Sequence, residues 1–360
     1  MEFLLLVFFT SFLVVLLSTP SLIKVAILKR LFDAPGDERK LHTRMIPTIG
    51  GIIIFAATVF SFVLWFPIRE IHDYSDVLKS VDDLKYILAT VLILFFVGVK
   101  DDIIGTAPIK KLVAHVIVGM VLVLMADIRL SGLHGIFGVR EIPYWASVFL
   151  SLFTYIVVVN AFNLIDGVDG LAGGIGFICS FAFGGWFCLA GDYVMAALAF
   201  ALSGSLLAFL IFNFSPAKIF MGDSGSLTIG LIICVLAIKL IEYDKTEQLP
   251  GFLLHISKPL FAMSVLVYPL VDTLRIFVYR AVRGVSPFSA DRNHLHHGLL
   301  DIGLNHRQTT ITLYVVNICI ITLTLALYRM DPSIELLLIG AVSIVSAQIP
   351  FFIKKRRNGK

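Results

Sequence analysis

Residues 147–174 read SVFLSLFTYIVVVNAFNLIDGVDGLAGG, in which a long apolar run gives way to two asparagines and two aspartates. A helix needs about 20 apolar residues to cross the hydrocarbon core of a bilayer, and a second apolar run follows at 171–190. Backbone polar groups inside a bilayer must be satisfied within the helix itself. The pattern therefore predicts two membrane-spanning helices joined by a short polar connection.

The composition extends this prediction to the whole chain. Of its 360 residues, 58% are hydrophobic and 15% charged, with a mean hydropathy of +0.93. The apolar runs are too long and too uniform for barrel strands, which alternate over about 10 residues. We predict a single polytopic domain over residues 1–360, an all-α integral membrane protein with about 10–11 transmembrane helices. The predicted spans cover approximately residues 3–22, 49–67, 84–99, 110–127, 143–161, 171–190, 194–212, 225–241, 258–279, 310–328 and 334–353.

Basic residues set the predicted orientation, because cytoplasmic loops carry an excess of Lys and Arg. With the N-terminus outside and the spans alternating, twenty of the 29 Lys and Arg residues fall inside, including those of the C-terminal KKRRNGK. This predicts an outside N-terminus and a cytoplasmic C-terminus. The loops rich in Asp, Asn and His fall on the same inner face, although the orientation rests on Lys and Arg alone. We therefore expect a cytoplasmic site built from several loops.

The polar stretch after residue 159 contains Asn163, Asp166 and Asp169, which recur at every third position. On a helix this spacing places them roughly along one face. Both aspartates precede glycine, and Asp-Gly is also a turn signal, so a plain connector is the alternative. A connector leaves Asn160, near the end of the apolar run, unexplained. We favour a functional site.

Three further aspartates lie at the inner ends of predicted spans. Asp101 and Asp102 are adjacent, and their mutual repulsion at a membrane edge would be offset by a divalent cation or a cationic partner. The alternative is a solvated helix end. Asp223 lies between two glycines in FMGDSGS, where it could hold Mg²⁺ and nearby amides could meet a phosphate. Its alternative role is an N-cap of the following helix.

Basic residues gather in two inner loops, one before the span at 49–67 and one before the span at 310–328. They are Lys40 and His42 in the first loop, and Arg292, His294, His296 and His297 in the second. Arginine and imidazole groups suit a pyrophosphate or a sugar, whereas the spacing does not favour zinc. Membrane anchoring and a solvated loop are the respective alternatives. The glycine pair at 50–51 could equally be a helix-packing position.

Carboxylates and basic groups on one membrane face are what a Mg²⁺-dependent reaction on a phosphate-bearing substrate requires. Phosphoryl transfer leaves a protein mainly positioning and charge neutralisation to supply. The membrane setting indicates that one substrate is a lipid.

Five motifs, in order between Asp33 and Gln308, resemble the polyprenyl-phosphate N-acetylhexosamine-1-phosphate transferases of glycosyltransferase family 4. They are DAPGDERKLHTRMIPTIGG, the Asp101–Asp102 pair, NLIDGVDGLAGG, FMGDSGSL and DRNHLHHGLLDIGLNHRQ. The last is similar to the D-R-x-H-L-H-H form of the branch that starts lipopolysaccharide O-antigen, enterobacterial-common-antigen or teichoic-acid linkage lipids. The H-H-H-F-E motif of the peptidoglycan translocase branch is absent.

The resemblance implies a reaction and a location. A UDP-N-acetylhexosamine, most simply UDP-GlcNAc, and undecaprenyl phosphate would give undecaprenyl-diphospho-sugar and UMP, with Mg²⁺ or Mn²⁺ as cofactor. The enzyme would be a multi-pass protein of the bacterial cytoplasmic membrane that initiates a cell-envelope polysaccharide. Membrane lipid is an expected partner and nucleic acid is not; a homodimer is compatible with the sequence.

The resemblance also implies roles for residues at the matching positions. Asp223, with Asp102, would coordinate the metal, and Phe220 would contact the uracil. Asp101 or Asp102 would act as base or nucleophile towards the lipid phosphate. The other implied site residues are Asn163, Asp166 and Asp169 at the nucleotide, Lys111 at a phosphate, His294, His296 and His297 at the diphosphate or sugar, and Lys40, His42 and Arg292 as further substrate contacts.

Other functions compete with this one. The same chemistry could use UDP-GalNAc, a deoxy-N-acetyl sugar or UDP-MurNAc-pentapeptide, and the final loop argues against the last. A transporter would expect paired acidic residues within spans near the midplane, whereas here they collect at one face. A scaffold without activity would tolerate Asp223→Asn.

Overall fold

The computed structural model describes residues 2–29, 32–33, 46–71, 73–245, 247, 249–284 and 294–358. Its elements in chain order are α1 (Glu2–Leu28), β1 (Phe32–Asp33), β2 (Ile46–Pro47), α2 (Gly50–Leu64), η1 (Ile68–Glu70), α3 (Tyr74–Ile104), α4 (Pro108–Met120), η2 (Val121–Met125), η3 (Ile136–Gly138), α5 (Tyr144–Leu164), α6 (Leu171–Ala190), α7 (Tyr193–Asn213), α8 (Gly222–Ile241), η5 (Leu253–His255), α9 (Lys258–Val265), α10 (Val267–Val282), α11 (Leu295–Asp301), α12 (His306–Ala326) and α13 (Pro332–Asn358). The two strands form one short antiparallel pair.

Helices long and apolar enough to cross a membrane make up most of the described chain. There are eight among the described residues, or nine if the bent pair α9 and α10 counts as one span. Two further helices coincide with predicted spans: α2 is apolar but has 15 residues, and α3 has 31 residues with a polar first part. The prediction of an all-α integral membrane protein is confirmed.

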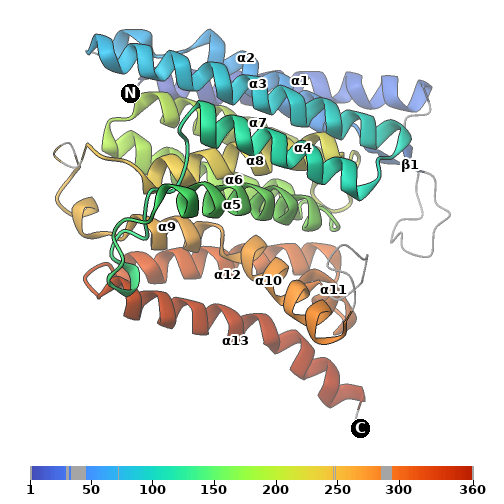
Figure 1. The fold of residues 1–360 in the computed structure, drawn as a ribbon. Helices are drawn as coiled ribbons and strands as arrows, with labels where there is room; N and C mark the ends of the chain where they lie inside the picture. The colour runs from blue at the N-terminus through green and yellow to red at the C-terminus, as the bar shows by residue number, and fades with distance from the viewer. Residues whose placement is uncertain are drawn as a thin grey trace.

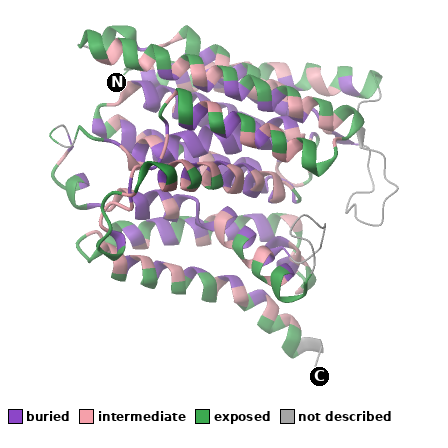
Figure 2. Ribbon diagram, viewed as in Figure 1, coloured by how far each residue is buried: buried purple, intermediate pink, exposed green. Residues whose placement is uncertain are grey.

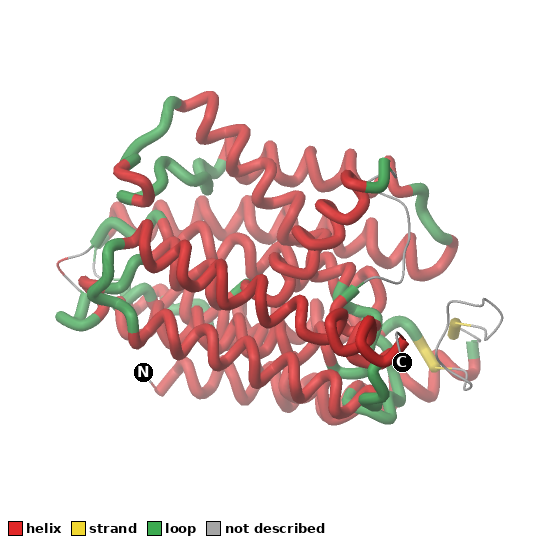
Figure 3. The backbone as a smooth tube through the Cα atoms, turned by 90° about the horizontal axis from the view of Figure 1, so that it is seen from below, coloured by secondary structure: helices red, strands yellow, loops and turns green. Residues whose placement is uncertain are grey.

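The helices lie side by side with their long axes running broadly the same way (Figures 1 and 3). The N-terminus lies at one end of the bundle, and the C-terminus, the β1–β2 pair and α11 lie at the other (Figure 1). Opposite ends for the two termini are what an odd number of spans requires. The assignment of the C-terminal end to the cytoplasm stays a prediction.

Burial separates a central helix from a lipid-facing rim (Figure 2). In α8, 89% of the apolar window is buried, against 28% in α1 and 22% in α13. The outer helices instead expose large apolar side chains, among them Leu17 at 71%, Phe149 at 71% and Val345 at 65%. An exterior this apolar suits hydrocarbon rather than water. The helix that carries Asp223 is thus held by neighbours on all sides.

The span predicted over residues 258–279 is not one continuous helix, because the chain breaks at Leu266 and bends by 76° between α9 and α10. Pro269 has no N–H to donate to the carbonyl of Val265, so a regular helix cannot continue there. Asn317 of α12 satisfies the groups at the break: its amide donates to Val265 O at 3.2 Å and accepts from Tyr268 N at 3.2 Å. The bend redirects α10 towards α11 and α13.

Candidate active site

One lysine joins two of the predicted catalytic aspartates. Lys111, in the first turn of α4, donates from Nζ to Asp101 of α3 at 2.7 Å and to Asp223 of α8 at 2.5 Å. These three side chains are 17–22% exposed, so they are accessible from the end of the bundle but largely shielded. The structure therefore brings together residues that are 112 positions apart.

Asn163 approaches the same carboxylate from α5. Its Nδ2 donates to Asp223 Oδ1 at 2.9 Å and lies 3.0 Å from the hydroxyl oxygen of Ser226. One oxygen of Asp223 thus accepts from the Lys111 ammonium, and the other accepts from the Asn163 amide. It lies in the first turn of α8, where the helix dipole favours negative charge. The N-cap alternative for Asp223 is wrong, because α8 begins before it, at Gly222.

Asp102 caps this helix from another part of the chain. Its two oxygens accept the backbone N–H groups of Asp223 at 2.7 Å and of Ser224 at 3.0 Å. Gly222 makes this approach feasible: its φ is +72°, and a Cβ there would lie 2.2 Å from the Thr48 carbonyl oxygen and 2.7 Å from both Asp102 oxygens. Asp102 therefore positions the start of α8, and its role as a metal ligand stays a prediction.

Asn163, Asp166 and Asp169 do not share a helical face, so that prediction is wrong. The helix α5 ends at Leu164, and both aspartates lie in the turn that precedes α6. Asp-Gly acts here as the turn signal that the sequence also offered. Side chains in a turn can point in different directions, and those of Asp166 and Asp169 do so.

Asp166 turns towards the acidic group. Its carboxyl lies close to the backbone N–H of Gly222, and the charges of Asp223 and Asp102 are close enough to act on it. Burial, followed by those two charges, raises the pKa of Asp166 well above its usual range. We call Asp101, Asp102, Asp166 and Asp223, with Lys111 and Asn163, the acidic cluster.

Asp169 turns the other way. It is buried, and its Oδ2 accepts the backbone N–H of Ala217 at 3.1 Å. His306, the first residue of α12, lies 3.8 Å from Oδ1 of Asp169. The hydroxyl of Thr310 donates to the backbone carbonyl of Asp169 at 2.9 Å. Asp169 therefore ties the turn to the loop before α8 and to α12.

The predicted histidines form a second group around a buried carboxylate that was not predicted from the sequence. Asp272 of α10 is 1% exposed, and its Oδ2 lies 2.8 Å from Nδ1 of His294. Its Oδ1 accepts the backbone N–H of Leu295 at 2.8 Å, which satisfies a free amide at the start of α11. One carboxylate thus fixes both a histidine ring and the short helix that carries the next two.

The histidine rings pack on one another and reach the turn that holds the aspartates. His294 and His296 stack with centroids 5.4 Å apart, and His296 and His297 lie 4.4 Å apart. A Cβ on Gly167 would lie 3.0 Å from His296 Nε2, so the ring rests against the residue after Asp166. We call Asp272, His294, His296 and His297 the histidine cluster.

Four other predicted contacts remain as predictions. Lys40, His42 and Arg292 lie outside the described residues. Phe220 is half-buried, and its backbone N–H donates to Pro47 O at 2.7 Å while its carbonyl accepts from Gly50 N at 2.9 Å. The glycine pair at 50–51 packs on the start of α8, because a Cβ on Gly51 would lie 2.0 Å from Gly225 N. Helix packing is therefore confirmed for that pair.

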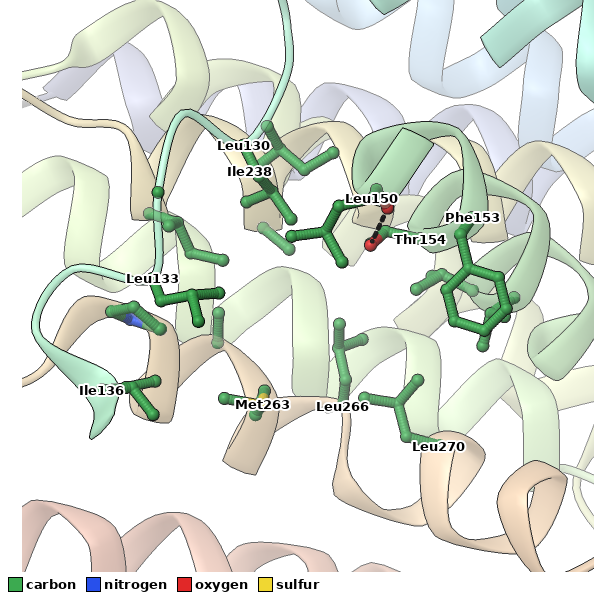
Figure 4. A pocket seen from close by; sticks show the side chains of 17 residues that line it. Leu130, Leu133, Ile136, Leu150, Phe153, Thr154, Ile238, Met263, Leu266 and Leu270 are labelled. Atoms are coloured by element: carbon green, nitrogen blue, oxygen red, sulfur yellow. Dashed lines mark hydrogen bonds between the residues drawn. The ribbon is translucent and has the colours of Figure 1, made fainter. Parts of the chain in front are cut away.

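A cavity of about 270 Å³ lies elsewhere, between α5, α8 and the break at α9 (Figure 4). Its walls are almost wholly apolar, and the hydroxyl of Thr154 donates back to Leu150 O of its own helix at 2.8 Å. On α8 its lining begins at Ala237, 14 residues after Asp223 and roughly 20 Å away at 1.5 Å per residue. It offers no group that could bind a phosphate.

Comparisons with known proteins identify the family of the chain. The sequence profile of glycosyl transferase family 4 matches residues 84–241. The undecaprenyl-phosphate alpha-N-acetylglucosaminyl 1-phosphate transferase of Escherichia coli (strain K12) is 32% identical over 292 residues, 79% of this chain and 73% of that protein. The chain belongs to glycosyl transferase family 4.

Two further relatives have similar coverage. The Yersinia pestis protein of the same name is 30% identical over 314 residues, 85% of this chain and 77% of that protein. The decaprenyl-phosphate N-acetylglucosaminephosphotransferase of Mycobacterium tuberculosis (strain CDC 1551 / Oshkosh) is 32% identical over 295 residues, 77% of this chain and 71% of that protein. The matched family segment of this family 4 chain contains the whole acidic cluster and ends before the histidine cluster.

Sequence reasoning missed two buried polar residues of this family 4 protein, Asp272 and His115. Both lie inside apolar runs that were assigned to spans. An ionisable residue within a membrane span is itself a signal of function, and that signal was available for both. Ser226, which contacts Asn163, lies in a quoted motif but has no charge to distinguish it.

The carboxylates of the acidic cluster are the residues that could hold Mg²⁺. Among the described residues no three His, Cys, Asp or Glu side chains converge to hold a metal alone. Mg²⁺ is usually bound by one or two carboxylates together with waters and substrate phosphates, so a cage of three is not needed. Asp101 and Asp223 already share one cation, the Lys111 ammonium. Their oxygens are the hard ligands that Mg²⁺ prefers.

Proposed function

We propose that this protein transfers N-acetylhexosamine 1-phosphate from a UDP-sugar to undecaprenyl phosphate, with Mg²⁺ as cofactor. The products would be undecaprenyl-diphospho-sugar and UMP. The sugar we favour is GlcNAc, because the relatives that match over most of their length are named for N-acetylglucosamine. The reaction would start a cell-envelope polysaccharide at the cytoplasmic membrane of a bacterium.

The observation that carries the proposal is the sharing of Lys111 by Asp101 and Asp223, with Asn163 on the second oxygen of Asp223. Even with Asp166 protonated, the other three carboxylates outnumber the one ammonium and leave this group with excess negative charge. Such a group attracts a divalent cation, and a cation bound there would accept the diphosphate of a nucleotide sugar. An open end of a membrane bundle lets a soluble donor meet a lipid acceptor.

The residues of the chain have separable tasks in this reaction. Asp223, with Asp101, would hold Mg²⁺, which when bound neutralises charge on the diphosphate. Lys111 would contact an acceptor or donor phosphate once a metal shares its carboxylate partners. Asp102 fixes the start of α8 and thereby the position of Asp223.

Direct attack by the lipid phosphate fits this arrangement. A phosphate monoester has a second pKa near ~6, so at neutral pH the acceptor is already largely a nucleophilic dianion. Its oxygen would bond to the phosphorus that carries the sugar, the bond from that phosphorus to the bridging oxygen would break, and UMP would leave. A general base would add little. Trapping a phosphorylated aspartate from UDP-sugar in the absence of lipid would contradict this route.

The histidine cluster would bind the sugar and diphosphate end of the donor. Burial lowers the pKa of His296 to about 3, so this ring is neutral at physiological pH and acts through hydrogen bonds rather than charge. The three rings pack on one another and against the turn at Gly167. They form a fixed surface that would distinguish one sugar from another.

The experiment uses purified protein with Mg²⁺, undecaprenyl phosphate and a panel of UDP-sugars, with mass spectrometry of the lipid product. We expect undecaprenyl-diphospho-GlcNAc and UMP in equal amounts, and a loss of both on adding a chelator. Sealed vesicles test for transport, which would move the donor inward without releasing UMP. The absence of product from every N-acetylhexosamine would overturn the proposal.

A further inference from the structure

A buried histidine lies one helical turn deeper in the bundle than Lys111. His115 follows Lys111 by four residues on α4, which puts the two side chains on the same helix face about 6 Å apart along the axis. His115 is 3% exposed. Its neighbours in sequence, Val113 and Ile117, are 51% and 50% exposed and face outward. His115 therefore points inward from a helix on the lipid-facing rim.

Asn160 of α5 pairs with this histidine and fixes its protonation. The Nδ2 group of Asn160 donates to the carbonyl of Ile156 at 2.7 Å and lies 3.3 Å from His115 Nδ1. A carbonyl can only accept, so Ile156 sets the orientation of the amide. The second N–H of that amide then faces Nδ1, which must accept. The ring is neutral, with its single proton on Nε2.

The consequence is a buried donor without an acceptor. His115 Nε2 is shielded from the surface and has no hydrogen-bond partner among the described residues. Buried polar groups are nearly always satisfied, and an exception in a native protein calls for an explanation such as a bound group. The acceptor that satisfies this N–H is therefore expected to be a ligand or a water.

The position of the pair indicates which ligand. The helices α4 and α5 run in opposite directions, and Asn160 precedes Asn163 by three residues as His115 follows Lys111 by four. The His115–Asn160 pair thus continues the acidic cluster towards the membrane interior. A nucleotide sugar reaches the cluster from water, whereas a phosphate carried on a polyprenyl chain reaches it from the hydrocarbon side.

We propose that His115 Nε2–H is a hydrogen-bond donor to the phosphate of the polyprenyl phosphate acceptor, with Asn160 as the residue that sets its tautomer. This inference rests on the proposed function for the identity of the lipid. It gives Asn160, which a plain connector leaves unexplained, a specific task. Neighbouring groups cover Nε2, so the acceptor binds with a small movement of the side chains around the ring.

The test compares His115→Leu with His115→Gln. A glutamine amide can accept from Asn160 through its oxygen and donate through its nitrogen near the position of Nε2, whereas leucine fills the space without a donor. We expect His115→Leu to raise the KM for undecaprenyl phosphate by on the order of tenfold, the effect of one lost hydrogen bond to a charged group. The KM for the UDP-sugar would stay within about twofold, and His115→Gln would stay close to wild type. Val113→Leu, on the lipid-facing side of α4, is the matched control.

Binding of undecaprenyl phosphate in nanodiscs, without donor or metal, separates this inference from the proposed function. A wild type that binds this lipid tenfold more tightly than His115→Leu but forms no product would refute the transfer reaction and support the inference. An unchanged acceptor affinity in a folded His115→Leu would overturn the inference. The Nε2–H group would then donate only to a buried water. Equal losses in the Leu and Gln variants would also overturn it. If His115→Leu does not fold, Asn160→Leu, which frees the tautomer, replaces it and should weaken acceptor binding by a smaller factor.

Discussion

The acidic and histidine clusters are built in opposite ways. The acidic cluster is assembled from the ends of α3, α4, α5 and α8 and from the turn before α6, and contacts between residues distant in sequence join Asp223 to Lys111, Asn163 and Asp102. The histidines come from one short helix and its first flanking residue, and one carboxylate of α10 orders them. The first cluster is partly exposed, at 17–22% for its linked side chains, and the second is at 1–7% for Asp272 and His294.

The acidic cluster therefore depends on charge, and the histidine cluster depends on shape. The acidic cluster holds more negative charge than Lys111 neutralises, so it is completed by a cation and by the substrates that arrive with it. The histidine cluster is closed and internally paired, so it contributes fixed hydrogen-bonding geometry. Variants that change charge at constant shape should therefore damage the first cluster more than the second.

The largest expected effect is that of Asp223→Asn. The substitution keeps the size of the side chain and removes the charge that binds Lys111 and, in our proposal, the metal. We expect transfer to fall by on the order of 10³-fold, within the range for loss of a group that stabilises charge in a transition state. The melting temperature should change little, because an amide can still accept from Asn163. Asp82→Asn, an exposed partner of Lys85, is the matched control and should keep full activity.

Asp166→Asn should lower the rate of transfer by about 10²-fold and raise the stability of the protein measured without substrates. Burial and the neighbouring aspartates raise the pKa of Asp166 in the folded state, whereas in the unfolded chain it is close to ~3.9. Above that pH the unfolded chain releases the proton more readily than the folded protein, so wild-type stability falls as pH rises. The variant has no such proton to lose.

The measurement for Asp166→Asn is thermal unfolding from pH 4 to pH 8, alongside activity. The melting temperature of the variant minus that of wild type should grow with pH and approach zero near pH 4. A variant with near-normal turnover would return this turn to the status of a connector. A melting-temperature difference that shrinks with rising pH would show that the carboxyl is stabilised as an anion.

The predictability of the fold differs from that of the site. Apolar runs such as 171–190 specify a membrane helix because the bilayer demands a fixed length of apolar residues, and α6 occupies the predicted residues. The break at Leu266 was missed because hydropathy does not register a bend, although Pro269 offered a signal. The turn after Leu164 was offered only as an alternative, because a three-residue spacing fits a helix as well.

In the site, polar residues near the ends of predicted spans could be found from sequence, and the contacts of ionisable residues inside spans could not be predicted. Asp101, Asp223 and Asn163 meet as expected for a shared site. The role of Asp102 as a cap depends on a helix 121 residues later, and no local pattern encodes that contact. Asp272 and His115 lie in apolar runs, so their partners became visible only when α10 met α11 and α4 met α5.

Asp272→Asn tests the fixed geometry of the histidine cluster. The single oxygen of asparagine can still accept the N–H of Leu295. Its NH₂ group cannot accept from His294, so the His294 ring should lose its orientation. We expect the KM for the UDP-sugar to rise by about tenfold, a loss of roughly 1.4 kcal/mol, with the KM for the lipid unchanged. A double-mutant cycle with His294→Gln should be strongly non-additive, because the two residues act through one hydrogen bond. Additive losses would show that Asp272 serves only to hold α11.

Gly167→Ala should have the smallest effect, and it tests whether the two clusters act as one site. The added Cβ would lie 3.0 Å from His296 Nε2, so the ring must shift by a few tenths of an ångström. Because the shift is small, we expect less than about 1 kcal/mol of lost stability, with a twofold to fivefold rise in the KM for the UDP-sugar on the order of 0.5–1 kcal/mol.

Gly185→Ala is the control for this change, since a Cβ there meets nothing within 4 Å. A rise in KM for the first variant alone would mean that the turn carrying Asp166 and the ring of His296 bind the same donor. Equal behaviour of the two alanine variants would leave the contact between the clusters without a part in binding, and the histidines would then have to recognise the sugar independently of the turn.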